Sequence, residues 1–152
     1  MGFRNQKHQQ LFFVCALVAC LSAPSFAHHM AVVTHRDNPV QNLSSNELAR
    51  ILEGETKKWN DGQTITLILH KSSSDEDGTI QRICKKSSAQ RKAFLLKHKD
   101  AIRWVNSDAD VIEAVATTPG AVGLVEAHSI KDRIAVIKID GKLPLEGGYL
   151  PH

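Results

Sequence analysis

Apolar residues along the chain fall into two patterns: short β-branched runs, and longer segments with a helical period. Runs of the first kind predict strands over 31–35, 64–70, 121–125 and 134–139. In the run 64–70, apolar side chains point to both faces, which is typical of a strand covered on both sides of a sheet. The first run ends at Pro39, which cannot continue a strand ladder.

Helical periodicity and capping residues predict four helices. The first opens at Ser44, which stands in capping-box spacing with Glu47. The others are expected over about 79–86, 87–105 and 108–117. Strands and helices therefore alternate along the chain, and this order predicts an α/β sheet with helices packed on it.

The beginning of the chain has a different character. Two basic residues precede an apolar run over 11–23, and Pro24-Ser-Phe-Ala27 follows with a small residue at its end. This order is typical of a secretory signal. The run is also shorter than the roughly 20 residues of a membrane span. We expect a cleaved signal peptide over 1–27, a single domain over 28–152 and a periplasmic protein without a transmembrane span.

A second processing route stays open. Leu17-Val-Ala-Cys20 fits the lipobox of a bacterial lipoprotein, and cleavage there leaves a lipid anchor on Cys20. Cleavage after Ala27 is favoured because the apolar region continues past Cys20 and then ends in a complete cleavage region.

Charge and cysteine content exclude several classes. The formal net charge is +3 at pH 7, and Arg4 and Lys7 of the signal segment contribute two of these charges. No basic stripe with interleaved aromatic residues is present, so no nucleic acid partner is expected. Cys15 and Cys20 lie in the signal segment and leave Cys84 alone, so no internal disulfide is expected.

No constellation for catalysis is visible. The serines do not form a Gly-x-Ser-x-Gly elbow. His35, His70, His98 and His128 show no i, i+4 pairing that would place two metal ligands on one helix face. We expect no enzyme activity, no cofactor and no metal site. Trp59 and Trp104, together with the apolar runs, are expected to pack in the core or against turns.

The most informative segment is 71–82, between the apolar run 64–70 and a predicted helix. Hydroxyl residues and glycine at a strand-to-helix turn are typical of an anion site, because amide N–H groups and the helix dipole favour negative charge there. The candidate ligand-binding residues are Ser72, Ser73, Ser74, Asp77, Gly78, Thr79 and Arg82. Lys71 is a further counter-charge.

Three consecutive carboxylates, Asp75, Glu76 and Asp77, oppose this interpretation because they repel an anion. A structural alternative is a solvated loop in which Asp77 caps the following helix. A calcium loop is a weaker alternative, because its acidic ligands alternate along the chain instead of standing side by side.

A series of motifs resembles a known family. They occur in the order Asn38-Pro-Val, Leu43-Ser-x-x-Glu-Leu, Trp59-x-Asp-Gly and Thr118-Pro-Gly-Ala-Val-Gly. The chain resembles the periplasmic phosphate-binding proteins of ABC transporters, and in particular the short, single-lobe phosphate ABC transporter substrate-binding proteins. The resemblance implies an α/β fold: a single three-layer lobe of the type 2 periplasmic-binding-protein fold, with a mixed sheet flanked by helices.

The resemblance also implies a site. In that family a Gly-Ser-Gly-Thr segment followed by arginine holds phosphate at a strand-to-helix turn. Gly78 and Thr79 match its last two residues, whereas Asp77 replaces the serine. Ile80 stands where the arginine is expected, and Arg82 lies further along the chain.

The implied function is an exported, non-enzymatic solute-binding protein for phosphate or another small oxyanion, which serves an ABC permease. A single lobe leaves its ligand face open to water, so tight binding requires a partner such as a second protein lobe. The alternative function is an envelope interaction or adaptor module, derived from a binding-protein lobe that has lost its ligand.

Overall fold

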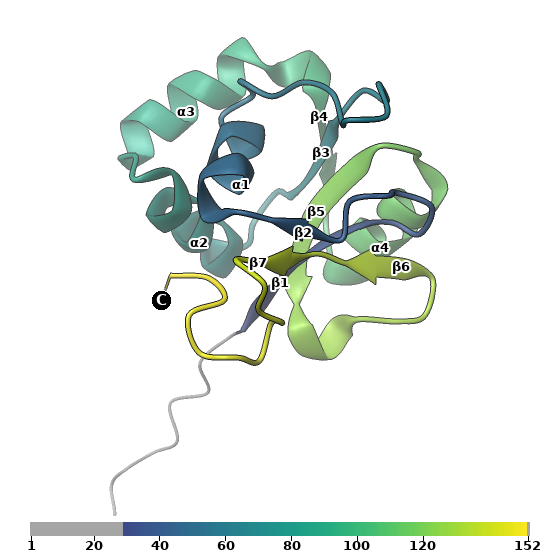
Figure 1. Ribbon diagram of the computed structural model, residues 1–152. Helices are drawn as coiled ribbons and strands as arrows, with labels where there is room; N and C mark the ends of the chain where they lie inside the picture. Colours follow the sequence, from purple (N-terminus) through teal and green to yellow (C-terminus); the bar gives the residue numbers. More distant parts are fainter. Residues whose placement is uncertain (1–28, 152) are drawn as a thin grey trace, which may run out of the picture.

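The computed structural model describes residues 29–151 (Figure 1). The predicted signal segment 1–27, with the alternative lipid site at Cys20, lies outside the described residues. Across 29–151, no helix combines the length and apolar character needed to cross a membrane.

Five strands form the main sheet, in the order β4-β3-β5-β1-β6. Their bounds are β1 (Met30–His35), β3 (Thr66–His70), β4 (Ile102–Val105), β5 (Ala121–Glu126) and β6 (Ile134–Val136). Strand β3 runs parallel to β4 and β5, whereas β1 runs antiparallel to β5 and β6. The predicted mixed sheet is therefore confirmed. A separate parallel pair joins β2 (Asn42–Leu43) to β7 (Lys138–Ile139).

Helices cover both faces of the main sheet (Figure 1). Their bounds are α1 (Ser45–Leu52), α2 (Ser74–Cys84), α3 (Ser88–Lys97) and α4 (Asp108–Thr117), with 3-10 turns η1 (Lys99–Ala101) and η2 (Ala127–Ser129). The predicted capping box of Ser44 and Glu47 is confirmed, and Ser87 forms a second one with Gln90.

The core consists of two apolar layers, one on each face of the sheet. Leu67 and Leu69 of β3 pack in the layer under α1, α2 and α3, whereas Ile68 packs in the layer under α4. The same alternation in β1 places Val32 in the first layer and Val33 in the second. These positions confirm the three-layer α/β lobe, and the buried run 64–70 is the strand that the pattern predicted.

One predicted helix is too long. The expected helix 87–105 ends at Lys97, and residues 102–105 form the edge strand β4. Ile102 pairs with Leu67, and Val105 pairs with His70 at the carboxyl end of β3. Apolar residues three positions apart fit a helical stripe, but here they lie on opposite faces of a strand.

Two further boundaries differ from the prediction. Helix α2 begins at Ser74, five residues before the expected start, because the Ser73 side chain accepts a hydrogen bond from the Glu76 amide and caps it. The expected strand 134–139 is divided between β6 and β7, which belong to different sheets. Ile137 lies between them, is fully buried, and donates its backbone N–H to Val32.

The two tryptophans differ. Trp59 is buried, as predicted, and its indole N–H donates to the Gly120 carbonyl at 2.9 Å. Gly120 has φ +78°, and a Cβ there would lie 2.2 Å from the Thr64 carbonyl oxygen, so a side chain cannot be accommodated. Trp104 instead is 40% exposed on the edge strand β4, so it does not lie in the core, which was one of the two places predicted for it.

The segment after β7 has no helix or extended strand, yet it is part of the core. Tyr149 and Leu150 are buried against the first apolar layer. The Tyr149 hydroxyl accepts from the Val32 amide at 3.0 Å and donates to the Ile137 carbonyl at 2.7 Å. Its burial raises the pKa of Tyr149 to about 12, so the phenol keeps its proton.

Replacing Tyr149 with Phe should remove this bridge and leave the Val32 amide buried without an acceptor. We expect the free energy of unfolding to fall by about 1–3 kcal/mol, measured by urea denaturation. Leu145→Ala is the matched control, because Leu145 lies in the same segment but is 75% exposed. An equal loss in both variants would contradict a specific role for the hydroxyl.

Candidate functional site

The candidate site lies where β3 and β4 end and α2 and α4 begin. The two strands are parallel neighbours, so their carboxyl ends meet at one edge of the sheet. The Lys71 amide donates to the Val105 carbonyl at 2.9 Å and ties the two following loops together. Ser73 caps α2 and Ser107 caps α4 at this edge. Open α/β sheets bind ligands at this position.

The amino end of α2 presents unpaired donors. The Ser72 amide donates to Nδ1 of His70 at 3.1 Å, and the Ser73 hydroxyl accepts from the Glu76 amide. Within residues 29–151, the amides of Ser73 and Ser74 have no acceptor. Two adjacent N–H groups at a helix start form the backbone half of an anion site.

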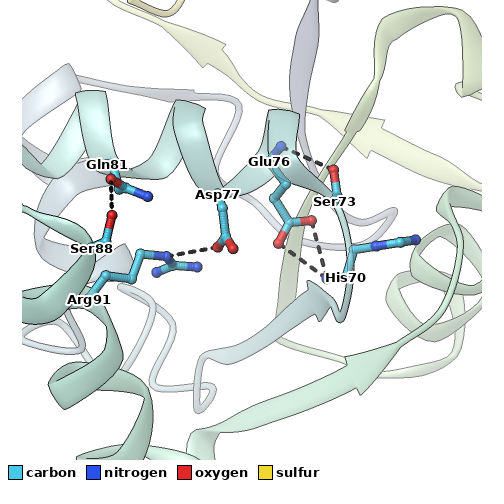
Figure 2. Close-up of polar contacts among 7 residues, drawn as sticks. All are labelled: His70, Ser73, Glu76, Asp77, Gln81, Ser88 and Arg91. Atoms are coloured by element: carbon cyan, nitrogen blue, oxygen red, sulfur yellow. Dashed lines mark hydrogen bonds and ion pairs between the residues drawn. The ribbon is translucent and has the colours of Figure 1, made fainter.

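The Glu76 side chain points toward the end of β3 and not outward from the amino end of α2. Its side chain is buried, and both carboxyl oxygens accept from the His70 amide, at 3.2 and 3.3 Å (Figure 2). Burial is the main cause that raises the pKa of Glu76 to about 8, and the hydrogen bond from His70 opposes it. At neutral pH this residue is therefore mostly protonated and contributes little negative charge to the site.

Asp77 is neutralised in a different way. Its Oδ1 lies 3.1 Å from Nε of Arg91 on α3 (Figure 2). The Arg91 side chain is only 7% exposed, and its Nη2 is buried with no hydrogen-bond partner in the described part of the chain. Gln81 accepts from the Ser88 hydroxyl at 3.2 Å and adds a second link between α2 and α3. Ser73, not Asp77, caps α2, so the capping role proposed for Asp77 is wrong.

The remaining predicted residues lie further along α2. Thr79 is buried, and its hydroxyl accepts from Nη2 of Arg82 at 3.2 Å. Arg82 also donates from Nε to the Pro151 carbonyl at 3.1 Å. Its Nη1 lies 3.2 Å from the position that a Cβ of Gly78 would occupy.

The structure therefore divides the predicted residues into two groups. Ser72, Ser73 and Ser74 lie at the amino end of α2, whereas Gly78, Thr79 and Arg82 form a cluster next to the C-terminal segment. The consecutive acids do not converge on one point. In residues 29–151, no group of three or more His, Cys, Asp or Glu side chains is placed to hold a metal ion.

Sequence reasoning missed the buried pair partner Arg91 and the inward position of Glu76. A signal for Arg91 exists in the sequence. It stands three and four residues before Phe94 and Leu95, which pack against the core, so the helical period places it on the same face. A charged residue on that stripe requires a buried partner.

The three-layer lobe, with its mixed sheet and a site at the strand ends, is that of the type 2 periplasmic-binding fold. The family model described as "PBP superfamily domain" matches residues 24–148, and the chain belongs to this family. The described lobe resembles part of the phosphate ABC transporter substrate-binding proteins, as the motifs predicted.

Individual proteins of known sequence or structure show the same likeness. The chain is 27% identical over 122 residues to the phosphate-binding protein PstS of Bacillus subtilis (strain 168), covering 76% of this chain and 37% of that protein. A putative phosphate ABC transporter substrate-binding protein with bound phosphate from Clostridium perfringens has a TM-score of 0.65 at 18% identity, covering 76% and 46%. An ABC-type phosphate transport receptor from Vibrio cholerae has a TM-score of 0.57 at 21% identity, covering 76% and 48%.

The matches share partial coverage of the relatives. The chain spans less than half the length of each of these three relatives. The lobe described here therefore corresponds to one part of those larger proteins.

The buried acid predicts a pH dependence of stability. The pKa of Glu76 is higher in the folded chain than its ordinary value of 4.5. The folded state therefore holds this proton more tightly, and the free energy of unfolding should fall as the pH rises from about 4.5 to about 8. Replacing Glu76 with Gln, which keeps an acceptor for the His70 amide, should flatten this part of the profile by on the order of a few kcal/mol. Urea denaturation at several pH values measures it.

Asp132→Asn is the control, because Asp132 is an exposed acid away from α2. The control should keep the slope of the wild-type profile. A wild-type profile that rises across this window, or a Gln variant with the same slope as wild type, would count against a buried protonated Glu76.

Proposed function

We propose that the protein is an exported, non-enzymatic solute-binding protein that holds phosphate or another small oxyanion at the amino end of α2 and serves an ABC permease. The amides of Ser73 and Ser74, at the carboxyl edge of β3, have no acceptor in the part of the chain that the structure describes, and this observation carries the proposal. Three relatives, named as phosphate-binding or phosphate transport proteins, support it.

The charge arrangement of α2 supports the same proposal. Three acids near a helix start oppose anion binding if all are ionised. Glu76 holds its proton at neutral pH, and Asp77 is paired with Arg91. Asp75 is the remaining acid of this triplet, and Lys71 is a basic residue close to it along the chain.

The described residues contact the proposed anion from one side only. The exposed side chains of Ser72 and Ser74 place the site at the surface, and this chain covers only 48% and 46% of two of the relatives. We infer that a second protein lobe, or the permease itself, covers the bound anion and supplies the contacts that this lobe lacks.

The function requires export. We propose that residues 1–27 are a signal peptide, and that the domain 28–152 is released into the periplasm. Mass spectrometry of the protein purified from the periplasm should find His28 as the first residue. A lipid-modified Cys20, or globomycin-sensitive processing, would instead identify a membrane-anchored lipoprotein.

Isothermal titration with phosphate at low salt tests the site directly, with Ser74→Pro as the sharpest variant. Ser74 is the first residue of α2, where proline is well tolerated, and Ser73 before it has the extended backbone that proline requires. The substitution removes one amide donor. Loss of a hydrogen bond to a charged ligand should weaken phosphate binding about tenfold or more.

Two further variants complete the design. Ser88→Pro makes the same change at the first position of α3. It also removes the Ser88 hydroxyl that donates to Gln81, which lies near the carboxyl end of α2, and it should leave phosphate binding unchanged. Asp75→Asn removes a like charge and should strengthen binding a few fold, whereas Asp132→Asn should not. Asp77→Ser is a less specific test of the site, because it also leaves the buried Arg91 without its partner.

If titration of the folded wild-type protein with millimolar phosphate released no heat, direct binding of phosphate by this lobe would be excluded. The alternative function, an envelope interaction module, is favoured by the exposure of Trp104 on the edge strand β4. Light scattering and cross-linking in periplasmic extract would then show a stable complex that Trp104→Ser weakens.

A further inference from the structure

A groove lies at the opposite end of β3 from the phosphate site proposed above. It consists of two adjoining hollows of about 250 and 540 Å³ between the residues that follow α1 and the last turn of α3. Both hollows are lined by Gly54, Lys57, Phe94, Lys97 and His98, and we call this surface the α1–α3 groove. Thr64 and Ala101, which lie just before β3 and β4, place it at the amino ends of these strands.

The floor of the groove is apolar and closely packed. Ile51 and Leu67 of the core line the smaller hollow together with Phe94. The Phe94 ring stacks on His98 with 4.6 Å between ring centroids. A Cβ on Gly54 would lie 3.0 Å from the Phe94 ring and 3.1 Å from the His98 ring, and glycine lets the backbone approach both. This gives a fixed surface for an apolar group.

The rim of the groove carries two lysines that have no acidic partner among the described residues. Among the described residues, Lys57 and Lys97 form no ion pair. The two glutamates that line the larger hollow have other partners: Glu53 lies 3.4 Å from Lys86, and Glu55 lies 3.5 Å from Arg50.

Asp100 lines the smaller hollow and opposes part of this charge. The balance of Lys57, Lys97 and Asp100 is still one net positive charge. An apolar floor beside unpaired ammonium groups complements a ligand that has both an apolar body and a negative group.

We propose that the α1–α3 groove binds a small aromatic carboxylate or sulfonate. The ring of the ligand lies on Phe94, and the anionic group lies between Lys57 and Lys97. Inorganic phosphate lacks the apolar part, so this site is separate from the amino end of α2 and does not depend on the function proposed there.

The probe is 8-anilinonaphthalene-1-sulfonate, an aromatic sulfonate that fluoresces when it leaves water. Folded wild-type protein, checked by circular dichroism, should show saturable binding of one probe per chain. Lys57→Gln and Lys97→Gln should each raise the dissociation constant about threefold, and the double variant about tenfold. High salt should weaken binding in the same direction.

Lys92→Gln and Lys99→Gln are the matched controls, because these exposed lysines lie on α3 and η1 but do not line either hollow. They should bind the probe as wild type does. Ten-millimolar phosphate, compared with sodium chloride at equal ionic strength, should not displace it. Amide chemical shifts in ¹⁵N spectra should change at Gly54 and His98.

Each other outcome overturns the proposal. Absence of saturable binding by the folded protein excludes the site. Equal weakening in Lys57→Gln and in Lys92→Gln shows general attraction to a basic surface. Specific displacement by phosphate, with shift changes at Ser73 and Ser74, assigns the probe to the amino end of α2. Failure of phosphate binding at α2 leaves these readings unaffected, so the two sites are tested separately.

Discussion

Burial of the main sheet on both faces is the constraint on which the rest of the lobe depends. Strand β3 presents Ile68 to the layer under α4, and Leu67 and Leu69 to the layer under α1, α2 and α3. Each such side chain contributes about 1.5–3 kcal/mol when it is fully buried. Sliding the strand by one residue would exchange the two faces, so its register is fixed. The end of β3 is then fixed as well, and with it the position at which α2 begins and presents its amide groups.

The acids of α2 show how burial changes the meaning of a charged sequence. Asp75, Glu76 and Asp77 are consecutive, but the helix directs Glu76 and Asp77 to different environments. Glu76 faces the end of β3 and holds its proton, and Asp77 faces α3 and pairs with Arg91. This arrangement links α2 to the strand before it and to the helix after it. It also lowers the negative charge around the amino end of α2, which a count of acidic residues overstates.

Much of the fold follows from the sequence, because local signals and burial agree there. The runs that became β1, β3 and β5 alternate or are apolar throughout, and Ser44 and Ser107 mark helix starts. Strand β4 could not be separated from the helix before it, because Ile102 and Val105 fit a helical stripe and only pairing with β3 shows that this segment is a strand. The start of α2 was placed too late because its serines and acids are also typical of a loop. Which acid turns inward depends on long-range contacts, such as that with Arg91, and no local pattern contains them.

The position of Glu76 makes the lobe bind a proton in the neutral pH range. The Glu76 carboxyl accepts from the His70 amide, at the strand end that precedes α2. If the proposed anion binds at the amino end of α2, it disfavours an ionised carboxyl on the same helix, and its binding should draw a proton from the buffer when the pH is near 8. The heat of binding then includes the ionisation enthalpy of the buffer. Titrations in buffers of different ionisation enthalpy count these protons, and the count reports how close the anion and the buried acid are.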